Sequence, residues 1–155
     1  MDITFKEIVE SLEPKYQALL KMTPVKMPNL PKDMPKEGIY LFSEGDKYLY
    51  VGRSNNIRRR LQYHTRPSGT HNLATFAFRI SREKTKQTKA TYSSDGSRVA
   101  LQNDPLFKKE FVDAKIRVSQ MEIRFIEETD SVRQALLEIY VATVLNTPYN
   151  DFHNH

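Results

Sequence analysis

Six polar side chains spread along this chain of 155 residues could together act on a phosphodiester bond. Phenols and a histidine can exchange protons with water, an arginine can stabilise charge on phosphate oxygens, and a lone carboxylate can bind a divalent cation. A terminal amide could hold a phosphate oxygen or orient the carboxylate. The six residues are Tyr40, Tyr50, Arg60, His64, Glu138 and Asn150. They can act together only if the fold gathers them, so the elements that carry them decide the prediction.

The two phenols lie in short aromatic segments that predict a β-hairpin. These segments are Gly38-Ile39-Tyr40 and Tyr50-Val51-Gly52. With the turn centred on Gly45, we expect Tyr40 opposite Tyr50 and Phe42 opposite Tyr48, on one aromatic face, with an aliphatic face behind it. The two hydroxyls would then point toward the arginine and the glutamate in a shallow, partly exposed cleft. The alternative is that helices simply bury this aromatic face.

A helix predicted over about residues 56–65 carries the arginine and the histidine on its inward face. Arg60 and His64 share that face with Ile57 and Leu61, at positions i, i+3, i+4 and i+7. Because an unpaired buried charge is costly, Arg60 needs a partner, and a phosphate near the tyrosines would be one. The alternatives are a salt bridge from Arg60 to a glutamate and a histidine satisfied inside the core.

The last predicted helix starts at a capping box, residues 131–134, and is ended by Pro148. Residues 136–145 are apolar nearly all round, and Glu138 is their only charge. A carboxylate on a mostly buried helix requires either a bound cation or an ion pair. The sequence leaves open which of these holds it, and Arg60 or another arginine would serve for the ion pair.

Positive charge is concentrated between residues 53 and 89, where ten lysines and arginines accompany a single glutamate. The whole chain has a net charge of only +5, so the remainder is slightly acidic. A basic block of this kind is typical of a surface that binds a polyanion, and the alternative is a solvated loop with surplus lysines. The residues predicted to contact a nucleic-acid backbone are Arg53, Arg58, Arg59, Arg79, Arg82, Lys84, Lys86 and Lys89.

The other patterns predict one domain that contains both helices and strands. They predict one kinked or two short helices over 3–21, a proline-rich connector over 23–36, a short helix near 72–80, a mobile loop over 83–103, a helix from 104 to about 114 and a third strand over 116–127. No apolar run is long enough to span a membrane. The absence of cysteine fits a reducing cytoplasm, where we expect the protein.

The ordered series of the two triplets, the arginine, the glutamate helix and a terminal Tyr-Asn pair resembles the GIY-YIG nuclease family over about residues 36–152. The resemblance implies an α+β fold, in which a small three-stranded antiparallel sheet is flanked by helices. We therefore expect an N-terminal helical extension with its connector over 1–35 and a GIY-YIG-like domain over 36–155, with a basic insertion at about 66–115. The implied activity is metal-dependent hydrolysis of phosphodiester bonds in DNA.

The resemblance also implies roles for the six residues. Of the two motif tyrosines, Tyr40 would position or deprotonate the attacking water, and Arg60 would stabilise the phosphate. Glu138 would be the single protein ligand of Mg²⁺ or Mn²⁺. His64 and Asn150 fall where family members carry a histidine or tyrosine and a terminal polar residue. The alternative function is a non-cleaving nucleic-acid-binding module on the same fold, and RNA stays open beside DNA, as does the oligomeric state.

Overall fold

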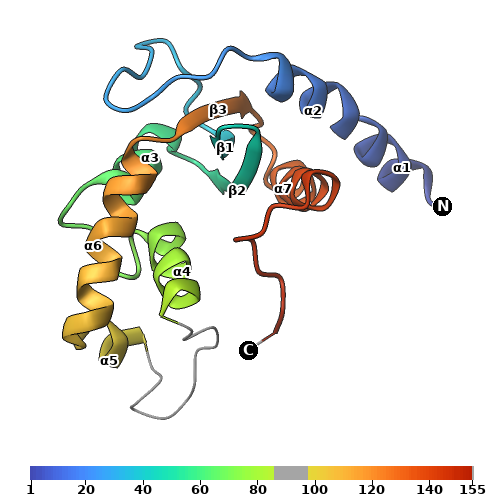
Figure 1. The fold of residues 1–155 in the computed structure, drawn as a ribbon. Helices are drawn as coiled ribbons and strands as arrows, with labels where there is room; N and C mark the ends of the chain where they lie inside the picture. Colours follow the sequence, from blue (N-terminus) through green and yellow to red (C-terminus); the bar gives the residue numbers. More distant parts are fainter. Residues whose placement is uncertain (86–97, 155) are drawn as a thin grey trace. The chain divides into compact units, whose positions relative to one another are not determined.

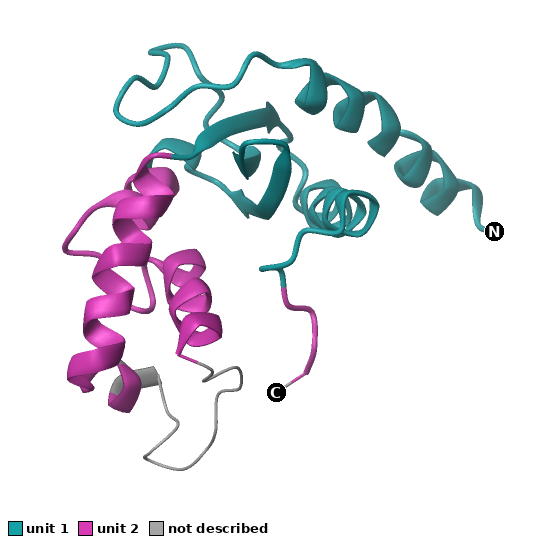
Figure 2. Ribbon diagram, in the orientation of Figure 1, with its two compact units in different colours: residues 1–59, 121–150 teal, residues 60–120, 151–155 magenta. Residues whose placement is uncertain are grey.

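The computed structural model describes residues 1–85 and 98–154 of the chain. The chain divides into two compact units. Residues 1–59 and 121–150 form the first unit, and residues 60–120 and 151–155 form the second (Figure 1, Figure 2). The predicted α+β fold with a three-stranded antiparallel sheet is confirmed. Within the described residues, no helix has the length and apolar character needed to cross a bilayer.

The sheet of the first unit has the strand order β2-β1-β3, so β1 is central and β2 is an edge strand. The strands are β1 (Gly38–Glu44), β2 (Lys47–Ser54) and β3 (Glu122–Glu127). Gly38 opens β1 with a φ of +153°, and a Cβ there would overlap the carbonyl oxygen of Ile126 on β3. The first glycine of the motif is therefore needed for the close approach of these two strands.

The register of the β1–β2 hairpin differs from the prediction. The observed Cα pairs include Tyr40 with Gly52, Phe42 with Tyr50 and, past a bulge, Ser43 with Tyr48. The predicted pairing of Tyr40 with Tyr50 is wrong by two positions. A two-residue turn at Gly45-Asp46 accounts for one position and the bulge next to Phe42 for the other. Because a shift by two keeps every side chain on its face, the two tyrosines still share one face.

Helices α2 and α7 contribute to the aliphatic core of the first unit. The buried members of this core are Leu12, Tyr16, Leu19, Ile39, Leu41, Val51, Leu137, Val141 and Ala142. Tyr48 packs against the same core and not beside Phe42 as predicted, because the bulge turns it to the aliphatic face. The N-terminal residues form two helices, α1 (Ile3–Glu10) and α2 (Leu12–Lys21), so α2 belongs to the core of the unit that carries the motif tyrosines.

Helix α7 differs from the prediction in two respects. It spans Ser131–Leu145, and its N-cap is Asp130, whose side chain accepts a hydrogen bond from the backbone N–H of Arg133. The predicted capping box therefore begins one residue too late. The helix is also less buried than its apolar sequence predicted, because the side chains of Ile139 and Val144 are exposed.

The second unit is helical. Helix α3 (Ile57–Thr65) enters it from the first unit, and α4 (Thr75–Lys84), α5 (Arg98–Asn103) and α6 (Pro105–Ser119) follow. Phe78 of α4 lies against Phe107 and Phe111 of α6, with ring centroids 5.0 and 5.7 Å apart. The arrangement is a small aromatic core between two helices.

Two predictions in this region are wrong. The strand predicted from residue 116 begins at Glu122, because the buried residues Phe111, Ala114 and Val118 keep a helical spacing that extends α6 to Ser119. The loop predicted over 83–103 contains α5 at its end, and residues 86–97 of that loop lie outside the described part of the chain.

Candidate active site

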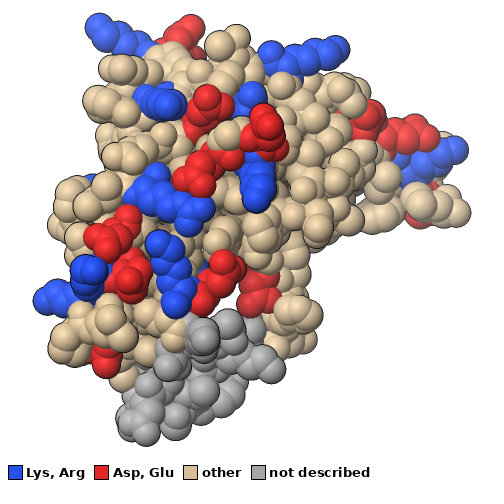
Figure 3. Space-filling model, in the orientation of Figure 1, with Lys and Arg blue, Asp and Glu red and all other residues tan. Residues whose placement is uncertain are grey.

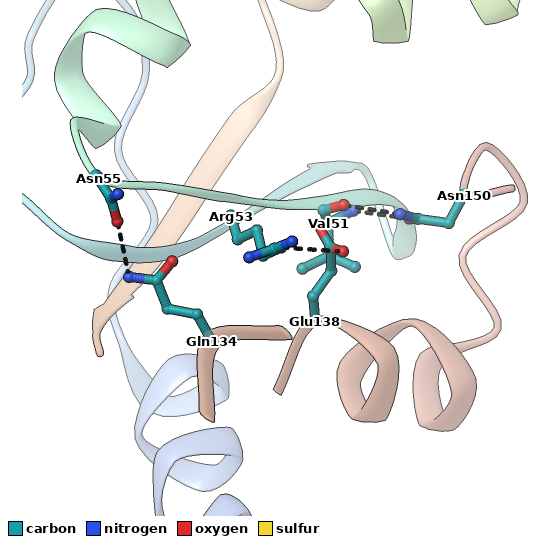
Figure 4. A network of polar contacts seen from close by, with 6 residues as sticks. All are labelled: Val51, Arg53, Asn55, Gln134, Glu138 and Asn150. Atoms are coloured by element: carbon teal, nitrogen blue, oxygen red, sulfur yellow. Dashed lines mark hydrogen bonds and ion pairs between the residues drawn. The ribbon is translucent and has the colours of Figure 1, made fainter. Parts of the chain in front are cut away.

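Three polar contacts fix α7 and the segment after it along β2 (Figure 4). They are Gln134 with Asn55, Glu138 with Arg53 and Asn150 with Val51. Val51 and Arg53 of β2 and Asn55, the residue that follows the strand, are two residues apart, a rise of about 6.7 Å. Gln134 and Glu138 are one helical turn apart, a rise of about 6 Å, so these two side chains of α7 meet Asn55 and Arg53 in turn.

Gln134 is a member of this network that the sequence analysis assigned only to a capping box. Its Nε2 donates to the carbonyl oxygen of Glu128 at 2.6 Å and to Oδ1 of Asn55 at 3.3 Å. Its position in the sequence could have indicated this role, because Gln134 lies four residues before Glu138 and the two side chains therefore share one face of the helix.

Glu138 forms an ion pair with Arg53. The distance from Oε1 of Glu138 to Nε of Arg53 is 3.9 Å, and the two side chains are 22% and 47% exposed. The sequence left open a bound cation or an ion pair with an arginine as the partner of Glu138. The structure shows an ion pair, and the arginine is Arg53. The pair is long and partly hydrated, so it contributes little to stability, and the carboxylate keeps access to water.

A single partly exposed carboxylate fits a magnesium or manganese ion that keeps most of its water. Mg²⁺ is commonly bound through one or two carboxylates and retains several water ligands. Among residues 1–85 and 98–154, no group of three or more histidine, aspartate or glutamate side chains is placed to hold a metal. The donor set around Glu138 therefore suits a water-rich cation and not a cage of protein ligands.

The motif tyrosines lie side by side and are buried. Their ring centroids are 6.4 Å apart, and Tyr40 and Tyr50 are 1% and 8% exposed, so the expectation of a partly exposed cleft at the phenols is wrong. A Cβ at position 52 would overlap the hydroxyl and ring of Tyr40. The last glycine of the second triplet therefore provides the space that the phenol of the first triplet occupies.

The phenols and the carboxylate meet β2 from its two faces. Tyr50 and Gly52 share the face of Tyr40, whereas Val51 and Arg53 lie on the opposite face, where α7 packs. The register therefore places the phenols and Arg53 on opposite faces of β2, and the predicted direction of the phenol hydroxyls toward the glutamate stays a prediction. What the two groups share is the edge strand β2, which carries one motif tyrosine and the arginine partner of the glutamate.

Asn150 binds the backbone in the middle of the second triplet. Its Oδ1 accepts from the N–H of Val51 at 2.9 Å, and its Nδ2 donates to the carbonyl oxygen of Val51 at 2.8 Å. The hydroxyl of Thr147 also donates to Oδ1, at 2.7 Å. The side chain thus completes the outer edge of β2 as a neighbouring strand would, which supports a positioning role, and direct contact with a phosphate stays a prediction.

Arg60 and His64 belong to the second unit. Nη1 of Arg60 donates to the carbonyl oxygen of Leu73 at 3.0 Å, and Nη2 donates to the hydroxyl of Thr75 at 3.1 Å. Both acceptors are uncharged, so they orient the guanidinium without neutralising it. An oriented guanidinium that keeps its charge is suited to a phosphate.

His64 is fully buried, as the core alternative expected. Burial, followed by the positive charges of Arg60 and Arg79, holds the pKa of His64 well below its ordinary value of 6.5. The imidazole is therefore neutral at physiological pH. Its predicted participation in proton transfer stays a prediction, since a ring with no exposed surface exchanges no proton directly with bulk water.

This burial predicts a pH dependence of stability. The unfolded chain, with the ordinary pKa of 6.5, binds a proton before the folded chain does, so the group has no effect above that pH and destabilises the fold below it. The one-proton limit is about 1.4 kcal/mol per pH unit. We expect urea unfolding to show that the free energy of unfolding falls more between pH 7.5 and pH 5.5 for the wild type than for His64→Gln. Equal losses in the two proteins would contradict the assignment.

The basic block is only in part exposed. The guanidinium of Arg58 donates to the carbonyl oxygen of Pro31, an uncharged acceptor, so its predicted contact with a nucleic acid stays a prediction. Arg82 is 7% exposed and lies over the ring of Phe78, with 5.8 Å from its Cζ to the ring centroid, which contradicts a backbone contact at the surface. Arg59 and Lys84 are exposed and Arg79 is half-buried, while Lys86 and Lys89 lie outside the described residues. On the face drawn in Figure 3, basic and acidic side chains are mixed.

Comparison with known proteins gives one match. A family model described as the GIY-YIG catalytic domain matches residues 36–150, which include all six predicted site residues. No significant match was found among curated proteins or among solved structures. The matched range agrees with the resemblance seen in the motif spacing, and it includes the second unit up to Gln120.

Proposed function

This chain belongs to the GIY-YIG catalytic domain family, and from that membership we propose that it is a divalent-metal-dependent endonuclease acting on DNA. The single observation that carries the proposal is the placement of Glu138. It is the only charged residue of residues 136–145, its side chain is 22% exposed, and it is held beside the second motif triplet by Arg53. A binding protein has no need for a carboxylate at that position, since it would repel a phosphate.

Glu138 would hold the Mg²⁺ or Mn²⁺ ion, with water as the other ligands. When bound, the cation would neutralise charge on the phosphate and on the leaving 3′ oxygen. The ion pair with Arg53 supports this role because it orients the carboxylate without burying it. The register contacts of Gln134 and Asn150 keep that carboxylate at a fixed position along β2.

Water would attack the phosphorus atom and the bond from phosphorus to the 3′ oxygen would break. The products are a 5′-phosphate and, once the 3′ oxygen has taken up a proton, a 3′-hydroxyl. A phenol is a weak base at neutral pH, so we assign to Tyr40 the positioning of the attacking water through its hydroxyl. Arg60 stabilises the charge that develops on the phosphate oxygens. The contacts to Leu73 and Thr75 support that assignment because they orient the guanidinium in advance.

A non-cleaving nucleic-acid-binding module is the second candidate. The observation that favours it is the burial of Tyr40, which is 1% exposed, because a phenol that acts on water must be reached by water. Nicking of supercoiled plasmid separates the two candidates: the endonuclease cuts only with the divalent cation, and the binding module retards the plasmid without cutting it in either condition.

The basic block makes a prediction that holds for both candidates. If it follows a phosphate backbone, the logarithm of the binding constant falls with the logarithm of salt concentration at a slope of about −0.9 per phosphate contact. Neutralising Lys84, Lys86 and Lys89 together should then make the slope shallower by up to about three units. Fluorescence anisotropy with a labelled duplex at several salt concentrations measures it. An unchanged slope would mean that these lysines are ordinary solvated residues.

A further inference from the structure

Lys115 is a buried lysine on α6, and its ammonium group holds the loop of residues 66–74 in the second unit. Its Nζ donates to the carbonyl oxygen of Pro67 at 2.6 Å and to that of Gly69 at 2.9 Å. The residue is only 6% exposed, and its Nζ lies 4.5 Å from the centroid of the Phe111 ring, one helical turn earlier. Burial also lowers the pKa of Lys115 from its ordinary value of 10.5. Because the ammonium is withdrawn from water, these bonds hold the loop more firmly than exposed bonds would.

This loop connects the end of α3 to the start of α4, and it is closely packed at Gly69. A Cβ at this position would lie 2.9 Å from the carbonyl oxygen of Tyr63 on α3 and 3.2 Å from the Cβ of Ala74. The carbonyl oxygen of Thr70 accepts from the backbone N–H groups of Leu73 and Ala74, at 3.0 and 2.7 Å. The carbonyl groups of residues 69 and 73 therefore belong to one compact turn.

Arg60 binds the same loop near its other end. Its Nη1 donates to the carbonyl oxygen of Leu73 at 3.0 Å, and its Nη2 donates to the hydroxyl of Thr75, the first residue of α4, at 3.1 Å. The carbonyl group that orients Arg60 lies four residues after the Gly69 carbonyl group that Lys115 holds. Since both groups belong to one compact turn, the direction of the guanidinium depends on both anchors.

We propose that Lys115 is a positioning residue for Arg60, because it fixes the loop whose Leu73 carbonyl group sets the direction of the guanidinium. The proposal rests on the proposed function for the task of Arg60 at the phosphate. It goes further because Lys115 lies at the end of the region predicted as a basic insertion, over about 66–115, and outside the six candidate site residues. One task of this region is then to hold the phosphate-binding arginine in place.

The first test observes the Arg60 guanidinium directly and needs no DNA. Its N–H resonances, assigned by their absence in Arg60→Gln, should shift in Lys115→Met, because the apolar side chain no longer binds the two carbonyl groups of the loop. The matched control is Val118→Ala, which removes two methyl groups from a buried position on the same helix and should leave these resonances in place. Arg60 resonances that keep their wild-type positions in folded Lys115→Met would overturn the proposal.

Gly69→Ala reaches the same loop without touching Lys115, and it keeps the test decisive if Lys115→Met does not fold. The added methyl group would meet the carbonyl oxygen of Tyr63, so the loop must move, and the Arg60 resonances should move with it. Unchanged Arg60 resonances in Gly69→Ala would mean that the loop does not position the guanidinium, and the proposal would be wrong.

The second test is a double-mutant cycle on DNA cleavage. Lys115→Met alone should lower the single-turnover rate in Mg²⁺ by about 10- to 100-fold, the effect expected when a group that contacts the reacting phosphate is misplaced. In the Arg60→Gln background, the same change should lower the rate less than about twofold, because the guanidinium is already absent. Equal losses in the two backgrounds would mean that Lys115 does not act through Arg60, which contradicts the proposal.

The positioning role and the endonuclease proposal fail in different ways. Arg60 resonances that shift in Lys115→Met and not in Val118→Ala, in a protein that never cuts DNA with Mg²⁺ or Mn²⁺, would support the positioning role and refute the endonuclease proposal. Cleavage that requires Arg60 and is unaffected by Lys115→Met would refute the positioning role and agree with the endonuclease proposal.

Discussion

Glu138→Ala should lower the rate of DNA cleavage on the order of 10³-fold or more and leave the fold intact. The metal contributes several kcal/mol to the stabilisation of the transition state, and each 1.36 kcal/mol corresponds to a factor of about ten. The carboxylate is partly exposed and its ion pair with Arg53 is 3.9 Å long, so its removal should change the free energy of unfolding by less than about 1 kcal/mol. Single-turnover cleavage and urea unfolding measure the two effects.

Glu10→Ala is the matched control for this variant. It breaks an ion pair of similar length, 3.8 Å to Lys6, in the same unit, and it should leave the cleavage rate unchanged. The metal-ligand role of Glu138 would be wrong if Glu138→Ala still cut DNA at the wild-type rate. It would also be wrong if the variant lost about 3–5 kcal/mol of stability, which is the effect of stranding a buried charge.

Tyr40→Phe should reduce cleavage by about 10²–10⁴-fold, the range typical of losing a group that handles protons. The phenylalanine ring keeps the contacts of Tyr40 with Phe42 and Tyr50, whose ring centroids lie 5.9 and 6.4 Å away, so the thermal midpoint should change little. The measurement is single-turnover cleavage under saturating Mg²⁺, with DNA binding determined separately in EDTA.

Tyr48→Phe provides the comparison on the same hairpin. Tyr48 packs against the aliphatic core on the other face, so loss of its hydroxyl should not affect catalysis. If Tyr40→Phe and Tyr48→Phe cleave equally well, the phenol of Tyr40 has no catalytic task. Its conformation over Gly52 would then be a matter of packing alone.

The sequence predicted the motif strands because aromatic and β-branched residues between turn signals fix both the element and its face. It did not predict their register, because a two-residue turn and a bulge leave no mark in the alternation near Phe42. The shared face of Tyr40 and Tyr50 was predicted correctly only because the combined shift is even. A shift by one residue would have placed the two phenols on opposite faces.

For the candidate site, the sequence identified which side chains are unusual but not which partners they take. Glu138 was recognisable as the lone charge of its helix segment, whereas its pairing with Arg53 depends on how α7 meets β2, which only the tertiary structure fixes. The same holds for Asn150, which binds a backbone 99 residues away in the chain. His64 was recognised as inward-facing from its helical spacing, and its lowered pKa follows from burial that no local pattern quantifies.

The most direct test of metal-dependent endonuclease activity is nicking of supercoiled plasmid by the full chain, with wild type and Glu138→Ala compared in Mg²⁺ and in EDTA. We expect the wild-type protein to convert the plasmid to nicked and linear forms in Mg²⁺ only, and Glu138→Ala to leave it supercoiled in both conditions while binding it as tightly as the wild type does in EDTA. A wild-type protein that binds the plasmid and leaves it supercoiled in Mg²⁺ and in Mn²⁺, or one that nicks it equally well in EDTA, would contradict the account.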